Sequence, residues 1–250
     1  MTTELVFQDT PYAKSCEAKV SVRTERGIEL DRTVFYPTGG GQPGDWGRIR
    51  VPGWGEVPEL GEDVPIVDTI KGHGANAIIH VPAPEARLPE VGEAVVAVVD
   101  WPRRHRLMRM HTCMHLLSAV LPYPVTGGQV GDGTGRLDFD IPEAILDKGE
   151  IAAKLNALIQ EGHAVGTEWI SDEALAAQPE LIKTMAVKPP SGLGQVRLVR
   201  IGELDLQPCG GTHVASTAEI GAITVTKTQK KGRHNRRVSL ALVGLDISTA

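Results

Sequence analysis

The sequence has few aromatic residues, few cysteines and no long apolar run, and each shortage excludes a class of protein. Phe, Tyr and Trp make up 4% of the 250 residues, so a long track of stacked bases on single-stranded nucleic acid is not expected. No apolar run reaches the roughly 18 residues of a membrane helix, and no basic start with an apolar stretch suggests secretion. The cysteines, Cys16, Cys113 and Cys209, are odd in number and far apart, which favours a reduced, cytoplasmic protein without disulfides.

Acidic and basic residues are unevenly distributed along the chain. The net charge is −5 over the whole sequence. Residues 1–100 carry 9 basic and 16 acidic side chains, a net charge of −7, whereas residues 101–250 carry 17 and 15, a net charge of +2. This difference in character predicts two domains, residues 1–99 and residues 100–250.

The first hundred residues have the pattern of short strands separated by glycine and proline clusters, which are densest from Pro37 to Pro65. Many short strands with such turns favour a small antiparallel barrel or sandwich. Apolar and β-branched residues predict strands at 4–7, 18–23, 28–35, 66–70, 77–81 and 94–99.

From Asp100 onward the apolar spacing changes to that of helices. Asp100 is a suitable cap and Pro102 suits a first turn, and apolar residues then recur every three or four positions until Pro122. Further helices are expected at 147–161 and 171–177, the latter capped by Ser171. Strands are expected at 196–201, 220–227 and 237–243, so the second part is predicted to be α+β.

Two short motifs offer metal ligands. His111 and His115 are four residues apart on a predicted helix, which places both imidazoles on one face. Cys209 and His213 enclose two glycines that let the backbone turn tightly. Two imidazoles, a thiolate and a third imidazole suit Zn²⁺ better than harder cations. Cys113 lies on another side of the helix and is predicted to be a core residue.

Each pair alone is more often an ordinary surface or core feature, but the two together predict one shared site. Thr112 follows the first histidine, where metalloproteases of the zincin type have a glutamate base, so that class is excluded. Four protein ligands would make a closed site and three would leave a position for water or substrate. The sequence leaves open whether His213 binds directly.

A glycine-rich loop follows the strand predicted at 28–35. Gly39, Gly40 and Gly41 lack the side chains that would prevent a close approach to the backbone, and the Gln42 amide offers both a donor and an acceptor. Glycines alone would fit a plain loop between strands. No Gly-Lys-Ser/Thr follows, so the loop is not a phosphate-binding P-loop.

Two basic clusters flank the predicted metal site and suit a phosphate backbone, although a solvated turn would also be basic. One precedes the metal-binding helix and the other lies in a predicted hairpin turn without any acidic residue. The residues expected to contact nucleic acid are Arg103, Arg104, Lys230, Lys231, Arg233, Asn235, Arg236 and Arg237.

These motifs together resemble the AlaX proteins, free-standing relatives of the editing domain of alanyl-tRNA synthetase. The matching segments, in family order, are FYPTGGGQPGD (35–45), HTCMHLL (111–117), VTGGQVGDGTGRLDFD (125–140), CGGTH (209–213) and KTQKKGRHNRRV (227–238). The glycine-rich loop points to the longer type. The resemblance implies an N-terminal β-barrel and a C-terminal α+β editing domain like that of threonyl- and alanyl-tRNA synthetases.

The resemblance also implies an activity and a set of site residues. The substrate would be tRNA(Ala) misacylated with serine, or with glycine, and the zinc ligands would be His111, His115, Cys209 and His213. Gln42 and the stretch 126–129 would line the substrate pocket. Gln129 stands near a position where some relatives have a hydroxyl residue. The predicted catalytic-site residues, expected to contact the substrate, are therefore Gln42, Thr126 and Gln129.

An aminoacyl ester is already reactive, so direct attack by water is expected, with the metal either activating that water or gripping the substrate. A buried polar group that hydrogen-bonds the serine hydroxyl would be left unpaired by alanine, so the site would discriminate against the alanyl ester. Two other classes remain open: a non-catalytic, zinc-stabilised RNA-binding module, and a metal hydrolase for small esters. An editing enzyme for another amino acid is a closer alternative. The oligomeric state is not predicted.

Overall fold

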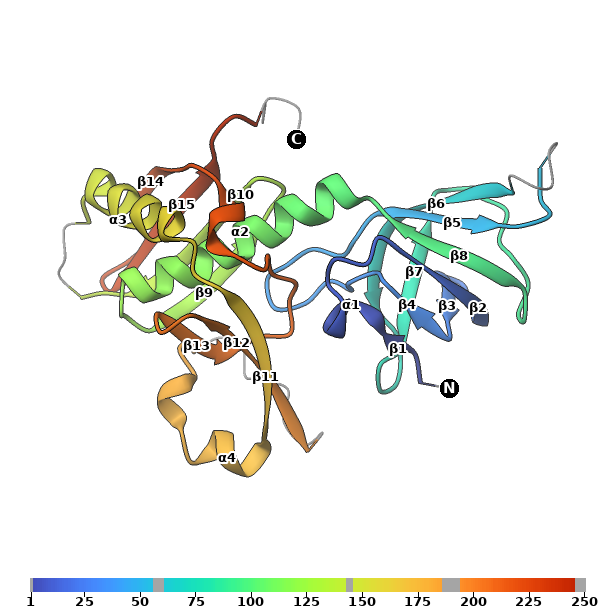
Figure 1. Cartoon of the computed structure of the whole chain (residues 1–250), viewed down its shortest axis with the longest axis horizontal. Helices are drawn as coiled ribbons and strands as arrows, with labels where there is room; N and C mark the ends of the chain where they lie inside the picture. The colour runs from blue at the N-terminus through green and yellow to red at the C-terminus, as the bar shows by residue number, and fades with distance from the viewer. Residues whose placement is uncertain (1, 56–60, 143–145, 186–193, 246–250) are drawn as a thin grey trace. The chain divides into compact units, whose positions relative to one another are not determined.

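The computed structural model describes residues 2–55, 61–142, 146–185 and 194–245 (Figure 1). Two compact units are present. The first contains residues 1–39 and 43–105, and the second contains residues 40–42 and 106–250. The middle of the glycine-rich loop therefore belongs to the second unit. The predicted division into domains 1–99 and 100–250 stays a prediction.

The first unit is built on a closed barrel of six strands that pair antiparallel throughout, in the order β2-β3-β7-β6-β5-β8. A short parallel pair, β1 and β4, and the four-residue helix α1 (Val6–Asp9) accompany it. The strands are β1 (Glu4–Leu5), β2 (Ser15–Thr24), β3 (Gly27–Leu30), β4 (Arg32–Thr33), β5 (Gly47–Val51), β6 (Glu62–Lys71), β7 (Ile78–Pro82) and β8 (Ala94–Val99).

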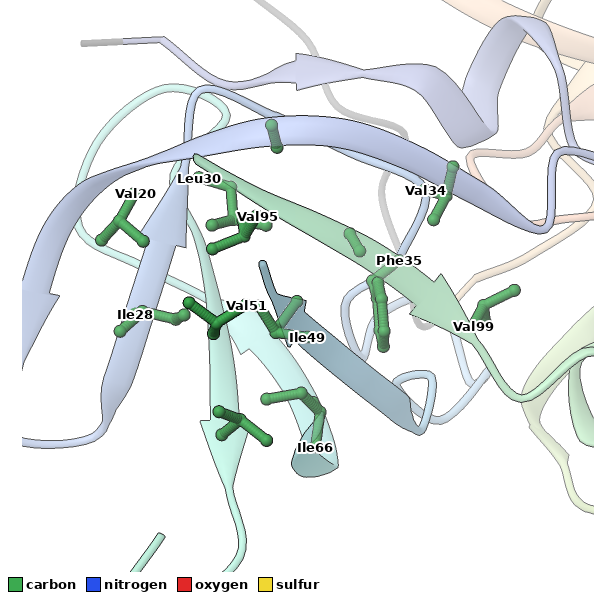
Figure 2. Packing of buried hydrophobic residues seen from close by; sticks show 13 residues of the cluster. Val20, Ile28, Leu30, Val34, Phe35, Ile49, Val51, Ile66, Val95 and Val99 are labelled. Atoms are coloured by element: carbon green, nitrogen blue, oxygen red, sulfur yellow. The ribbon is translucent and has the colours of Figure 1, made fainter. Parts of the chain in front are cut away.

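Branched aliphatic side chains fill this barrel, as the scarcity of aromatic residues requires. Figure 2 shows Ile28 and Leu30 of β3, Ile49 of β5 and Val95 of β8 pointing into the same interior, with Phe35 beside them. Each of these side chains is almost fully excluded from water. Their burial supplies the main stabilising term of the barrel.

The second unit begins within helix α2 (Trp101–Val120), which starts after Asp100 and ends two residues before Pro122. The Asp100 carboxylate accepts from the backbone N–H of Arg103, as expected of a cap. Helices α3 (Lys148–Glu161) and α4 (Asp172–Ala176) are capped by Asp147 and Ser171. These three helices confirm the sequence predictions to within a few residues.

Two antiparallel sheets complete the second unit, in the orders β14-β15-β10-β9 and β11-β12-β13. Gly128 on β9 and Gly135 on β10 face α2, where an added Cβ would meet Met114 and Met110. The missing side chains therefore let α2 lie close against the larger sheet. The strands are β9 (Val125–Val130), β10 (Thr134–Asp140), β11 (Val165–Ser171), β12 (Gln195–Ile201), β13 (Asp205–Pro208), β14 (Ile223–Lys230) and β15 (Asn235–Leu242).

The predicted fold class, α+β with a small antiparallel barrel, is confirmed. The strand prediction at 4–7 is partly wrong because α1 begins at Val6, and the strand predicted at 28–35 divides into β3 and β4. Strands β5, β9, β10, β11 and β13 were not predicted. Among the described residues, no helix is both long and apolar enough to cross a membrane.

Candidate metal centre

The two predicted ligand pairs converge in the second unit. His111 and His115 lie one turn apart on α2, and Cys209 and His213 lie in the loop that follows β13. One ligand atom from each residue lies within 4.8 Å of all the others. The three imidazoles are buried, and Cys209 is half-buried. The arrangement is therefore a candidate metal centre made from two segments almost a hundred residues apart.

The spacing of the ligand atoms fits a tetrahedral ion. Cys209 Sγ lies 3.5 Å from His111 Nε2 and 3.3 Å from His213 Nε2. A tetrahedral zinc with bonds of about 2.0 Å to nitrogen and 2.3 Å to sulfur separates the two donor atoms by about 3.5 Å. The donor set and its distances thus match a site for a borderline-soft cation.

His115 is oriented by a buried carboxylate. Its Nδ1 lies 3.0 Å from Asp205 Oδ2, and Asp205 also accepts from Lys183 and from the Gln207 amide. Because an ionised carboxylate only accepts, His115 Nδ1 carries the proton and Nε2 presents its lone pair to the cluster. A carboxylate in this position fixes the ring and raises its basicity as a ligand.

Thr112 performs the same task for His213. Its hydroxyl donates to the carbonyl oxygen of Met108 at 3.0 Å, and its oxygen lies 3.1 Å from His213 Nδ1. Since the hydroxyl proton is already used, the oxygen accepts from Nδ1–H. His213 therefore also directs an unprotonated Nε2 at the cluster.

Gln42 orients the third histidine. Its Oε1 accepts from the backbone N–H of Thr212 at 3.2 Å and lies 2.8 Å from His111 Nδ1, while its Nε2 donates to Thr212 Oγ1. A backbone N–H can only donate, so the Gln42 atom that Thr212 contacts is the amide oxygen. His111 Nδ1 contacts the same oxygen and therefore carries the proton that it donates. Gln42 is only 1% exposed. Its contacts are those of a group that holds a metal ligand, and its predicted role toward substrate stays a prediction.

The cluster favours an ionised thiol. Burial raises the pKa of Cys209, but the neighbouring His111 and His213 outweigh it and hold that pKa well below its usual value. Burial and the charge of His111 lower the pKa of His213 to about 3. Burial also lowers the pKa of His115, but hydrogen bonds to Asp205 and Cys209 prevail and raise it to about 9, so a metal ion that binds Nε2 would displace a proton from it. The thiolate is the form that binds a metal.

The two glycines of the CGGTH motif differ in their surroundings. A Cβ on Gly211 would lie 2.2 Å from His111 Cε1 and 2.9 Å from Gln42 Oε1. A Cβ on Gly210 would meet no atom of the described residues within 4 Å. The His111 ring therefore requires glycine at 211, whereas position 210 borders open space beside Cys209.

The glycine-rich loop runs along strand β9. The Gly41 carbonyl oxygen accepts from Val130 N–H at 2.8 Å, and a Cβ on Gly41 would lie 2.9 Å from the Gly128 oxygen. Gly41 has φ +84°, a conformation that favours glycine, and Gly40 has φ +57°. This close approach places Gln42 at the metal centre.

Thr126 and Gln129 lie on β9 and contact other polar groups. Thr126 Oγ1 accepts from the Asn235 amide at 3.1 Å, and Gln129 Oε1 accepts from the Arg136 guanidinium at 3.0 Å. Gln129 points to the sheet face opposite Gly128, whose own face lies against α2. The structure therefore does not bring Gln129 together with the histidines of α2.

The basic residues predicted to bind nucleic acid fall into two groups. Lys230, Lys231 and Arg233 are exposed at the turn of the β14–β15 hairpin. The other hairpin residues are engaged locally: Asn235 donates to Thr126, Arg236 to backbone oxygens, and Arg237 forms an ion pair with Asp138.

Arg103 and Arg104 are buried in the first unit. Arg104 is fully excluded from solvent and donates to the Asp45 carboxylate and to the carbonyl oxygen of Val34. Arg103 donates to the carbonyl oxygen of Gly44 and lies over the Trp46 ring. The expectation that Arg104 faces a phosphate is therefore corrected: its charge is paired within the first unit, by a carboxylate 59 residues away in sequence.

Sequence reasoning missed the groups that orient the histidines. Thr112 stands inside the HxxxH motif, and Asp205 precedes Cys209 by four residues, so their closeness to the ligands was the available signal. Gln207, two residues before Cys209, offered the same signal, whereas Lys183 offered none. Cys113 is fully buried, and burial raises its pKa to about 12, in agreement with its prediction as a core residue.

Comparisons with known proteins agree with these features. The family model described as tRNA synthetases class II (A) matches residues 3–103, and the Threonyl and Alanyl tRNA synthetase second additional domain matches residues 196–239. The alanyl-tRNA editing protein AlaX-M of Methanosarcina mazei is 35% identical over 97% of this chain and 97% of its own length.

Two further relatives extend the comparison. Alanyl-tRNA editing protein AlaX-L of Pyrococcus horikoshii is 33% identical, over 94% of this chain and 57% of its own length. An alanine–tRNA ligase of Pyrobaculum aerophilum is 34% identical, over 92% of this chain and 25% of its own length. With the barrel, the editing-type second unit and the His/Cys cluster in place, the chain belongs to the AlaX family of alanyl-tRNA editing proteins.

Proposed function

We propose that this protein is an aminoacyl-tRNA deacylase that removes serine, and in second place glycine, from mischarged tRNA(Ala). The observation that carries the proposal is the buried cluster of His111, His115, Cys209 and His213, found in a chain that is similar over its whole length to alanyl-tRNA editing proteins. Ester hydrolysis by water needs no covalent nucleophile, so Cys209 is free to serve as a ligand.

The resident ion is proposed to be Zn²⁺. A thiolate with three imidazoles is a donor set that suits zinc, and each imidazole presents Nε2 to the centre because its Nδ1 is engaged elsewhere. When bound, the ion would supply a fixed positive charge next to the ester or the terminal ribose.

The protein's own residues position the reactants. The exposed backbone at Gly210 leaves room beside Cys209 for the aminoacyl end. Gln42 fixes His111, and the Gly41 contact fixes Gln42, so the loop and the ligand helix hold one geometry. Correct placement of the ester toward water is then the main source of rate enhancement.

Selection of serine would require a polar partner for its hydroxyl. Thr126 is the proposed partner, and its hydroxyl oxygen already accepts a hydrogen bond from the Asn235 amide. Gln129, which points to the opposite face of the sheet, is left out of this proposal. A serine hydroxyl bound at Thr126 would share this hydrogen-bonding group, and alanine would leave it unsatisfied.

The test is a deacylation panel with Ser-tRNA(Ala), Gly-tRNA(Ala) and Ala-tRNA(Ala). The proposal expects the seryl ester to be hydrolysed fastest and the alanyl ester to be spared. Binding without turnover would instead identify a non-catalytic RNA-binding module. Equal activity on free seryl esters would identify a small-ester hydrolase, and activity on tRNA charged with an unrelated amino acid would identify a different editing enzyme.

A further inference from the structure

The exposed aromatic side chains of the first unit gather at one place. Trp46 is 48% exposed directly before β5, and Tyr12 is 38% exposed. Trp101 begins α2, and its ring centroid lies 5.5 Å from that of Tyr12. Among the described residues, the second unit also exposes two aromatic side chains, Tyr123 and Trp169, but in the first unit Trp46 and Tyr12 are both next to Trp101.

Trp46 and Trp101 line the same hollow, whose volume is about 550 Å³. Its apolar lining also includes Ile66, Val98 and Pro102. A volume of several hundred cubic ångströms is typical of sites for small organic groups. The Trp101 ring is already stacked on the imidazole of His105, so the half-exposed indole of Trp46 is the flat π-surface that the wall offers to a planar ring.

Positive charge accompanies these indoles. Lys14 Nζ lies 5.2 Å from the centroid of the Trp101 ring, and the Arg103 guanidinium lies 4.0 Å from that of Trp46. Arg48 also lines the hollow and forms an ion pair with Asp63. Asp100, the acidic residue in the lining, accepts from the first turn of α2. Lys14 is therefore the exposed cation best placed to meet an anion.

We propose that this hollow binds an unpaired nucleotide of RNA, with its base against the indole of Trp46 and its phosphate facing Lys14. Aromatic faces combined with basic side chains are the means by which proteins hold unpaired nucleotides. The inference rests on the proposed function for the identity of the partner. It adds an RNA contact in the acidic first unit, where the charge of residues 1–100 is otherwise unfavourable.

The experiment compares two tryptophans of matched exposure. Trp46→Leu removes one wall of the hollow, whereas Trp169→Leu removes a 47% exposed tryptophan from β11 in the second unit. Fluorescence anisotropy measures the affinity of the full chain for tRNA(Ala), for a short single-stranded RNA and for a blunt duplex of equal charge.

The expected result is a loss of single-stranded RNA and tRNA affinity for Trp46→Leu of roughly five- to a hundredfold, the range found for one stacked base, with Trp169→Leu unchanged. Duplex binding should be the same in both variants. Lys14→Gln should reduce the slope of log affinity against log salt by about 0.7, one phosphate contact.

Equal RNA affinity of the two tryptophan variants would overturn the inference. So would a change in sedimentation for Trp46→Leu at unaltered RNA affinity, which would show that the hollow is a contact between copies of the chain. These outcomes are separate from failure of the proposed function: a wild-type protein that binds RNA through Trp46 but deacylates nothing would refute the function and keep the site.

Discussion

At the scale of single residues, the metal centre depends on groups that never contact the ion. Each histidine is held at Nδ1 by a different partner, Asp205, Thr112 or Gln42. The ligands themselves could be predicted because helical periodicity and a short Cys–His spacing are local signals. Asp205 and Gln42 could not be assigned to this role, because only the folded chain brings them to the imidazoles.

Substitution of each glycine of the CGGTH motif should show whether metal binding needs the close packing of Gly211 against His111 or only a flexible loop. Gly211→Ala should lower metal affinity at least tenfold, because the new Cβ would displace the His111 ring. Gly210→Ala, which meets nothing, is the matched control and should bind metal as the wild type does. Competition with a chromophoric chelator measures both. Comparable losses in the two variants would contradict the packing argument.

His80 should make the barrel sensitive to acid. Its side chain is buried, accepts from the Thr33 hydroxyl, and has a pKa lowered by burial to about 4. An unfolded histidine titrates near pH 6.5, so stability from the neutral ring is fully present above that pH. It is lost as the pH falls toward 4, by about 3 kcal/mol in total.

An NMR titration tests this expectation. The His80 Cε1–H resonance, identified from its absence in His80→Asn, should shift little between pH 8 and pH 5. A titration midpoint near pH 6.5 in the folded protein would show that the buried neutral ring is not what the barrel requires.

At the scale of elements, local signals explain what could be predicted. Helices α2, α3 and α4 are capped by Asp100, Asp147 and Ser171, and residues with side-chain oxygens cap helices without tertiary help. Strands β5 and β9 are rich in glycine or surrounded by glycine and proline, and only their pairing partners make them strands. Such pairing is not readable from local sequence.

The glycine-rich loop should be sensitive to one methyl group at Gly41. Gly41→Ala adds backbone strain and a contact with the Gly128 oxygen, which should move Gln42 and lower kcat/KM for the seryl substrate about tenfold or more. Gly53→Ala is the control, because Gly53 has almost the same φ, +83°, but no atom of the described residues within 4 Å of the new Cβ. Equal losses of kcat/KM in the two variants would show that backbone strain at a positive φ, and not the contact with the Gly128 oxygen, causes the effect.

At the scale of the whole molecule, the net charge conceals an uneven distribution of acidic and basic residues along the chain. The net charge of −5 combines an acidic first part with a second part whose exposed cations include the hairpin turn. The sequence revealed this asymmetry, but it could not show that Arg104 forms a buried ion pair with Asp45. The hairpin turn therefore carries more of the proposed RNA contact than the sequence indicated.

Neutralising the turn should weaken tRNA binding through its salt-dependent part. The double variant Lys230→Gln, Lys231→Gln should bind tRNA(Ala) less tightly and reduce the salt slope by about 1.4 to 1.8. The control, Lys148→Gln with Lys154→Gln, removes the same charge from exposed positions on α3. Identical salt slopes for the two double variants would place the RNA elsewhere.

The central claim is that the His/Cys cluster supports deacylation of mischarged tRNA(Ala). The most direct measurement is the initial rate of serine release from Ser-tRNA(Ala) by the wild type, by Cys209→Ala and by the control Cys16→Ala, which changes a half-buried cysteine of the barrel. We expect the wild type and Cys16→Ala to release serine at similar rates, far above buffer. Cys209→Ala should lose both its zinc and most of this activity. A wild-type rate no faster than buffer, or a fully active Cys209→Ala, would contradict the account.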